Sequence, residues 1–263
     1  MPGQLFRFRD LGELGLRHPR GYVGSWMRMR RRLKIRTTIA ALAIAAGATT
    51  AAAATLDVGD VVRLTGTSLE TGRTVRVVSA LDSRGAVNLN AGQFNHNTDL
   101  PGRIWTFCTE IGENTGNGDF VVRNLSDAPV PGDGMGEAKA DAVGRLYQFA
   151  LDSGRDIFNQ LDQTSDDDRN FAAAFQMAIW DVVEDFGTTA GLGSDDGGFQ
   201  VRQFDRGGSN DTAIETYFNQ LLAAANGSVE LDSQIRLLGL TNDGRQDQVY
   251  FVVVPLPSSA GLA

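Results

Sequence analysis

Two residues of this sequence, Cys108 and Gln176, are chemically able to form a covalent bond with each other. Cys108 is the only cysteine of the chain, so it cannot form an intramolecular disulfide. Gln176 belongs to a predicted helix, residues 170–187, and its neighbours on the same helix face are apolar. A primary amide on such a face needs hydrogen-bond partners, because leaving it without them costs about 1–3 kcal/mol. A buried thiol that attacked this amide would release ammonia and leave an internal thioester.

The segment RIWTFCTEI, residues 103–111, is predicted to be a strand because it is rich in β-branched and aromatic residues. Alternation along the strand places its largest side chains on one face: Trp105, Phe107 and Ile111. Cys108 and Glu110 take the other face, which we expect to lie under the helical region, opposite Gln176. A carboxylate there disfavours the thiolate. Glu110 could nevertheless accept or donate a proton during thioester formation.

These two stretches resemble the motifs of a known family, the Cys–Gln thioester domains of bacterial surface adhesins. The resemblance lies in Phe107-Cys108 and in QMAIW at residues 176–180. It implies a thioester between Cys108 and Gln176, with Phe107, Ala178 and Trp180 packed around it. It also implies that the protein couples covalently to amines or hydroxyls on a target surface.

Two other interpretations of Cys108 remain open at this point. Cysteine is among the most often buried residue types and behaves as a small hydrophobic residue, so Cys108 could be inert and Gln176 could bond to a strand backbone or to Glu110. A cysteine hydrolase would require direct contact between Cys108 and a histidine. We expect His96 to be a solvated loop residue, because it lies in the polar stretch QFNHNTDL. No cofactor and no metal site are predicted, since so few soft ligands are present.

The charge of the chain is divided unevenly. Residues 1–54 carry ten Arg and Lys and two acidic residues, which leaves 14 basic and 30 acidic residues for the remainder. Such an acidic remainder excludes nucleic acid as a partner, because phosphate binding needs a basic face. Residues 27–54 combine a basic start, an apolar run and small residues, and so predict a secretory signal peptide. Residues 1–26 are interpreted as a non-native leader or a start-site extension.

The C-terminal residues, 255–263, follow a strand that ends in VVVPLP. This ending resembles the start of a PEP-CTERM-type sorting signal in its Val-Pro-Leu-Pro form. The resemblance implies export to the surface or matrix of a Gram-negative-type bacterium, in association with exopolysaccharide and biofilm. It also implies a truncated tail, because the family's membrane helix does not follow, so that membrane contact would occur only through this missing anchor.

Residues 55–254 are predicted to form a single α+β domain resembling the thioester domains. Strand-like segments come first, about three helices are inserted, and strands follow again, which indicates helices packed on an antiparallel, β-sandwich-like sheet. LETGR, residues 69–73, is predicted to be the turn of a hairpin. We expect an exported surface or biofilm-matrix protein that is not an enzyme and attaches through a thioester. The alternative is a structural or carbohydrate-associated matrix protein with an inert Cys108.

Overall fold

The computed structural model describes residues 56–100, 102–130, 134–189, 191–193, 195 and 197–254. The predicted leader, signal peptide and C-terminal tail lie outside these residues. The described elements are, in order, β1 (Val61–Ser79), β2 (Val87–Thr98), β3 (Arg103–Cys108), β4 (Gly118–Asn124), a 3₁₀ turn (Leu125–Asp127), α1 (Gly136–Asp152), α2 (Asp166–Asp185), β5 (Phe199–Gln203), α3 (Asp211–Ala225), β6 (Ile235–Asn242) and β7 (Arg245–Val253). None of the described helices is long and apolar enough to cross a membrane.

The described strands form one antiparallel sheet that closes on itself. Their order is β2-β3-β7-β6-β4-β1-β5, and β1 also pairs with β2. This additional pairing joins the first strand of the series to the sixth and leaves β5 on the end of β1. The predicted α+β class, with helices inserted between two groups of strands, is therefore confirmed. The closure of the sheet into a ring was not visible in the sequence.

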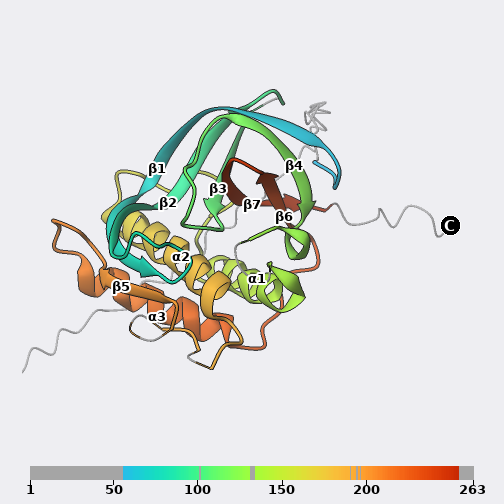
Figure 1. Cartoon of the computed structure of the whole chain (residues 1–263). Coiled ribbons are helices and arrows are strands. Elements are labelled where there is room, and N and C mark those ends of the chain that lie inside the picture. Colours follow the sequence, from blue (N-terminus) through green and yellow to red (C-terminus); the bar gives the residue numbers. More distant parts are fainter. Residues whose placement is uncertain are drawn as a thin grey trace, which may run out of the picture. The chain divides into compact units, whose positions relative to one another are not determined.

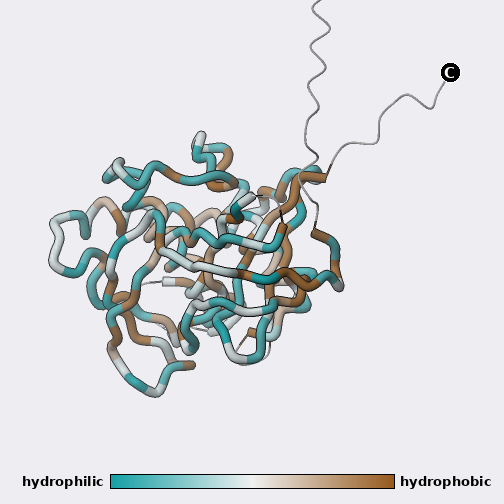
Figure 2. The backbone as a smooth tube through the Cα atoms, turned by 90° about the horizontal axis from the view of Figure 1, so that it is seen from above, coloured by the Kyte–Doolittle hydropathy of each residue, from teal (hydrophilic) through white to brown (hydrophobic). Residues whose placement is uncertain are grey.

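The ring has two hydrophobic cores, one on each face of the sheet. The larger core lies between the sheet and the helices, and α2 is its centre. Figure 1 shows α2 beneath the arch of β1 and β2, with α3 on its other side. The smaller core gathers apolar side chains of β1, β3, β4, β6 and β7: among them Leu64, Ile104, Phe120, Leu238 and Leu240. Figure 2 shows hydrophobic and hydrophilic residues interspersed along the backbone, and buried residues alternate with more exposed ones at the start of β1 and in β4, as expected where one face of each strand is buried.

Strand β1 runs without interruption through the segment that was predicted to be a hairpin turn. Its register with β2 shifts between Thr65 and Thr67 and again between Leu69 and Thr71, so β-bulges bend the strand instead of ending it. Gly72 lies opposite Gly92 on β2. A Cβ atom at Gly92 would lie 2.1 Å from the main-chain oxygen of Thr71. The glycine that suggested a turn therefore serves the close approach of two strands.

Helix α2 is stabilised at its start by a capping serine and an acidic first turn. The side chain of Ser165 accepts a hydrogen bond from the main-chain N–H of Asp168, and the first turn carries Asp166, Asp167 and Asp168. Both features suit the positive N-terminal end of a helix. Along the rest of α2 nearly every side chain is buried, Gln176 included. The helix therefore lies within the domain and carries Gln176 to the sheet.

Candidate functional site

The structure brings Gln176 and Cys108 into direct contact. The Oε1 atom of Gln176 accepts a hydrogen bond from the main-chain N–H of Cys108 at 2.8 Å. The Nε2 atom of Gln176 donates to the main-chain oxygen of Cys108 at 2.7 Å. Both residues are buried, with exposed fractions of 0% and 1%. The side-chain amide of Gln176 thus occupies the position of a strand partner beside the single cysteine.

This contact exists because β2 separates from β3 before Cys108 is reached. The pairing of β2 with β3 ends at Phe94 and Thr106, while on its other edge β3 continues to pair with β7, where Cys108 lies opposite Gln248. The N–H and C=O of Cys108 point to the edge that β2 has left. Buried main-chain groups need partners, and the side chain of Gln176 supplies both.

The side chain of Cys108 does not point toward the helices, which corrects the face assignment made from the sequence. Phe107 takes that direction, with its ring centroid 4.7 Å from that of Phe175 on α2. Alternation then turns Cys108 to the inner face of the ring. There its Sγ atom lies 3.4 Å from Nε2 and 3.5 Å from Oε1 of Gln248. Gln176 reaches the edge of the strand, and the thiol lies on the strand's inner face.

His96 lies inside the closed sheet and not in a solvated loop, so that expectation was wrong. It belongs to β2 and is only 1% exposed. Its Nδ1 atom is 3.0 Å from Oγ1 of Thr67, and its Nε2 atom is 2.8 Å from Oγ1 of Thr106. The polar run around His96 is a buried strand and not a loop, and the ring of His96 finds its partners on the neighbouring strands β1 and β3.

A chain of hydrogen bonds links His96 to the thiol. The Nε2 atom of Gln248 donates to the main-chain oxygen of Gln246 at 2.9 Å, which fixes the orientation of that amide. Thr106 then donates to Oε1 of Gln248 at 2.8 Å. The hydroxyl of Thr106 must therefore accept from His96, whose ring carries its proton on Nε2. Because Thr106 and Gln248 stand between His96 and Cys108, the geometry does not form the Cys–His pair of a hydrolase.

The electrostatic surroundings keep Cys108 in its thiol form. Burial raises its pKa well above the ordinary range, and the charge of Glu110 adds to this effect, while the hydrogen bond to Gln248 opposes it. A protonated, buried sulfur is a poor target for oxidants and metals.

Glu110 is buried beside β7. One carboxylate oxygen accepts from the main-chain N–H of Asp247 at 3.1 Å, and the main-chain oxygen of Glu110 accepts from the side chain of Gln246. Burial raises the pKa of Glu110. These contacts hold Glu110 against β7. Its predicted role in proton transfer would require the proton to cross the space between the carboxylate and the thiol.

The three predicted packing residues are all buried, and Ala178, two residues after Gln176, lies on another side of α2. Phe107 contacts α2 as described, and Ala178 is fully buried on that helix. Trp180 lies one turn beyond Gln176 and borders a pocket of about 250 Å³. Its indole N–H has no hydrogen-bond partner within the described part of the chain.

The burial of His96 predicts a measurable pH dependence of stability. Burial lowers the pKa of His96 from 6.5 to about 4. The unfolded chain therefore takes up a proton before the folded protein does, and stability falls as the pH decreases from about 6.5 to about 4. The loss should reach about 3 kcal/mol. Asp181 and Asp247, whose pKa values burial raises to about 8 and about 7, act in the opposite direction.

The contribution of His96 is therefore measured as a difference. Urea unfolding at several pH values gives the free energy of unfolding of wild type and of His96→Gln. Plotted against pH, the two curves should converge as the pH falls. Parallel curves would mean that His96 is protonated as easily in the folded protein as in the unfolded chain.

Sequence reasoning missed Gln248 and Thr106, the two residues that connect the thiol to His96. Gln248 alternates with Gln246 in QDQVYF, which indicates a strand with polar residues on one face. That signal is equally typical of a strand with one solvated face. Only the closure of the ring shows that this polar face is an interior one.

Comparisons with known proteins give one distant structural neighbour. No protein-family model matches the chain, and no curated protein matches it. Among solved structures, the chain is similar to the N-terminal domain of the Streptococcus pyogenes pilus tip adhesin Cpa, with a TM-score of 0.38 and 13% sequence identity. The match covers 72% of this chain and 99% of that one. The function proposed below rests on the contacts of Cys108 and Gln176.

Proposed function

We propose that this protein attaches covalently to surface amines or hydroxyls through an internal thioester between Cys108 and Gln176. One observation carries the proposal. The side-chain amide of Gln176 is hydrogen-bonded to both main-chain groups of Cys108, the only cysteine of the chain, in a site closed to water. The two residues are therefore held together before any reaction, which favours an intramolecular attack once the sulfur has turned away from Gln248.

Thioester formation requires a rotation of the Cys108 side chain, a transfer of its proton, and the release of the hydrogen bond from Nε2 of Gln176 to the main-chain oxygen of Cys108. The sulfur now contacts Gln248 on the β7 side of the strand, and a different staggered χ1 rotamer turns it toward the edge that Gln176 occupies. The sulfur then attacks the amide carbon of Gln176. The thiol proton goes to the departing nitrogen, which leaves with its own two hydrogens as ammonia, and a C–S bond replaces the C–N bond.

The coupling step regenerates the free thiol of Cys108. An amine or hydroxyl on the target attacks the carbonyl carbon of the thioester, the C–S bond breaks, and the nucleophile's proton passes to the sulfur of Cys108. The product is an amide or ester bond between Gln176 and the target. The site is consumed in this step, so the protein acts as a coupling device and not as an enzyme with turnover. Burial of both residues keeps the thioester from water until a target arrives.

The cellular location and the partner proposed for this reaction are inferred from the sequence. The signal-like segment, residues 27–54, and the PEP-CTERM-like ending support export to the cell surface or biofilm matrix of a Gram-negative-type bacterium. The acidic remainder of the chain supports a partner other than nucleic acid. Exopolysaccharide, which is rich in hydroxyls, is the partner that these features favour.

The structural alternative is supported by the same contacts. Gln176 is fully hydrogen-bonded as an unreacted amide, so a purely structural role for Gln176 and an inert Cys108 also accounts for its burial. In that case the protein is a structural or carbohydrate-associated matrix protein. The two functions differ in one chemical property, the presence of the bond.

Intact mass spectrometry of the purified protein separates them. With the thioester, freshly folded wild type should be lighter than its sequence mass by one ammonia, and methylamine should add as a whole molecule. Cys108→Ala should show neither change. Gln93→Ala is a matched control, because Gln93 is also fully buried and bonded to main-chain groups but is not beside the cysteine. An unmodified wild-type mass, with a thiol that reacts once the protein is unfolded, would rule out the thioester.

A further inference from the structure

The pocket beside Trp180 is a second feature with a chemical use. It is lined by residues of β2, the segment after β3, α2 and β7: Asn88, Leu89, Asn90, Phe94, Ile111, Glu113, Asn114, Thr115, Trp180 and Gln246. Its volume of about 250 Å³ lies below the roughly 300–1,000 Å³ of pockets for drug-sized ligands. It therefore suits a ligand of about one ring.

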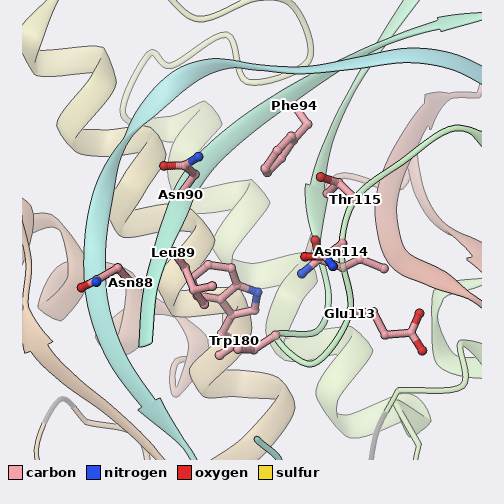
Figure 3. Close-up of a pocket in the computed structure, with 10 residues that line it drawn as sticks. Asn88, Leu89, Asn90, Phe94, Glu113, Asn114, Thr115 and Trp180 are labelled. Carbon is pink, nitrogen blue, oxygen red and sulfur yellow. The ribbon is translucent and has the colours of Figure 1, made fainter. Parts of the chain in front are cut away.

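The unpartnered indole of Trp180 points to a ligand in this pocket. Trp180 is only 2% exposed, and its N–H has no hydrogen-bond partner among the described residues. A buried donor without a partner costs free energy of about 1–3 kcal/mol. Figure 3 shows the indole nitrogen directed toward Asn114, with Asn90 and Phe94 across the pocket. The indole nitrogen itself has almost no accessible surface, so an acceptor atom bound there would satisfy it once a neighbouring lining side chain such as Asn114 moves.

The remaining lining defines the chemistry of that ligand. Asn88, Asn114 and Thr115 make no side-chain hydrogen bonds within the described part of the chain, and amide and hydroxyl groups can both donate and accept. Glu113 is the one charged residue of the lining, so an anionic ligand would meet repulsion and no cation. Phe94 adds an aromatic surface. A ligand that matches this set is neutral, carries several hydroxyls and has an apolar ring face.

We propose that the Trp180 pocket binds a neutral sugar ring, such as a hexose unit of a polysaccharide. The pocket also adjoins the Cys108–Gln176 pair. Trp180 lies one turn beyond Gln176 on α2, and the main-chain oxygen of Gln246 accepts from Gln248, whose amide contacts the thiol. Neither Cys108 nor Gln176 lines the pocket, so a sugar held there would lie near the pair and would reach its carbonyl only after the buried site opens. This second role, as the acceptor site, rests on the proposed thioester, whereas sugar binding itself does not.

Non-covalent binding is tested in Cys108→Ala, which cannot form the thioester. The probes are glucose, galactose, mannose and N-acetylglucosamine, with glucuronate as the charged counterpart, and the readout is the indole N–H resonance of Trp180 by NMR. At least one neutral sugar should shift this resonance in a saturable manner, and glucuronate should bind more weakly. The indole of Trp105, which does not line the pocket, should not move.

Two variants test whether the shift of the Trp180 resonance is caused by sugar binding in this pocket. Asn114→Ala should weaken binding by about three- to tenfold, the effect of one lost hydrogen bond. Asn219→Ala, an exposed asparagine of α3, should have no effect. An unmoved Trp180 resonance with all four neutral sugars would overturn the proposal, as would equal binding by Asn114→Ala.

The same samples distinguish this inference from the proposed function. Sugar binding to Cys108→Ala together with an unmodified wild-type mass would support the pocket and reject the thioester. A thioester in wild type together with no sugar binding would support the bond and reject the pocket as its acceptor site.

Discussion

Replacing Gln176 with alanine is expected to lower the free energy of unfolding by roughly 3–5 kcal/mol. The substitution leaves both the N–H and the C=O of Cys108 without their partner, at an edge that β2 has already left. Each unpaired buried group costs about 1–3 kcal/mol. The cavity left by the amide adds to the loss. This cost does not depend on a covalent bond, because it concerns the unreacted amide.

The measurement is urea unfolding in the Cys108→Ala background, where no thioester can contribute. Gln160→Ala serves as the control, because Gln160 is exposed and its side chain makes a single, long hydrogen bond among the described residues, to Glu70. A change within about 0.5 kcal/mol is expected there. A loss at Gln176 below about 1 kcal/mol would show that the main chain of Cys108 finds other partners.

Gln176→Glu provides a second test of the same contact. One carboxyl oxygen can still accept from the N–H of Cys108, but the other faces the main-chain oxygen of that residue and must be protonated. The pKa of the new carboxyl should therefore be raised in the folded protein. Its stability should fall as the pH rises above about 4, the ordinary range of a glutamate. A pH dependence equal to that of wild type would contradict the assigned orientation of the amide.

Replacing Asp181 with asparagine is expected to stabilise the protein at neutral pH by roughly 4 kcal/mol. Asp181 is fully buried in α2. One of its oxygens accepts from the N–H of Gly193 at 3.0 Å, and the other has no partner among the described residues. Burial, and after it the charge of Asp185, raises the pKa of Asp181 from 3.8 to about 8. The folded protein therefore holds a proton that the unfolded chain releases.

The direction of the stability change follows from the higher pKa of Asp181 in the folded protein than in the unfolded chain. The contribution of Asp181 is fully present below about pH 4 and is lost as the pH rises toward about 8. At pH 7 about three pH units of this window have been crossed, at about 1.4 kcal/mol each. Asparagine keeps an acceptor for Gly193 and does not titrate, so the variant should be more stable than wild type by an amount that grows with pH.

Asp185→Asn is the matched control one turn further along α2. The two oxygens of Asp185 accept from the N–H groups of Gly198 and Phe199 at 2.7 and 2.8 Å. Asparagine would place its own N–H groups against one of these donors, so this variant should be destabilised by about 1–3 kcal/mol. Chemical unfolding between pH 5 and pH 8 measures both variants. Equal effects of the two substitutions would show that Asp181 is as well satisfied as Asp185.

The sequence determined the helices and the two residues of the candidate site. Helix α2 could be predicted because its acidic start, the glycine at its end and the apolar neighbours of Gln176 are all signals from residues close together in the chain. Gln176 stood out for the same reason, as a polar side chain whose helical neighbours are apolar. Cys108 was conspicuous as the only cysteine. These signals come from residues close together in the chain, so they can be recognised in a single sequence.

The tertiary structure decided which face of β3 meets the helices and where His96 lies. Alternation separates Phe107 from Cys108, but only the packing of α2 selects Phe107 as the residue that faces it. The polar run around His96 is typical of a loop, and it became an interior strand because β1 pairs with β2 and closes the sheet. Closure depends on residues far apart in the chain. No local pattern encodes it, so the network from His96 to the thiol could be found only in the folded protein.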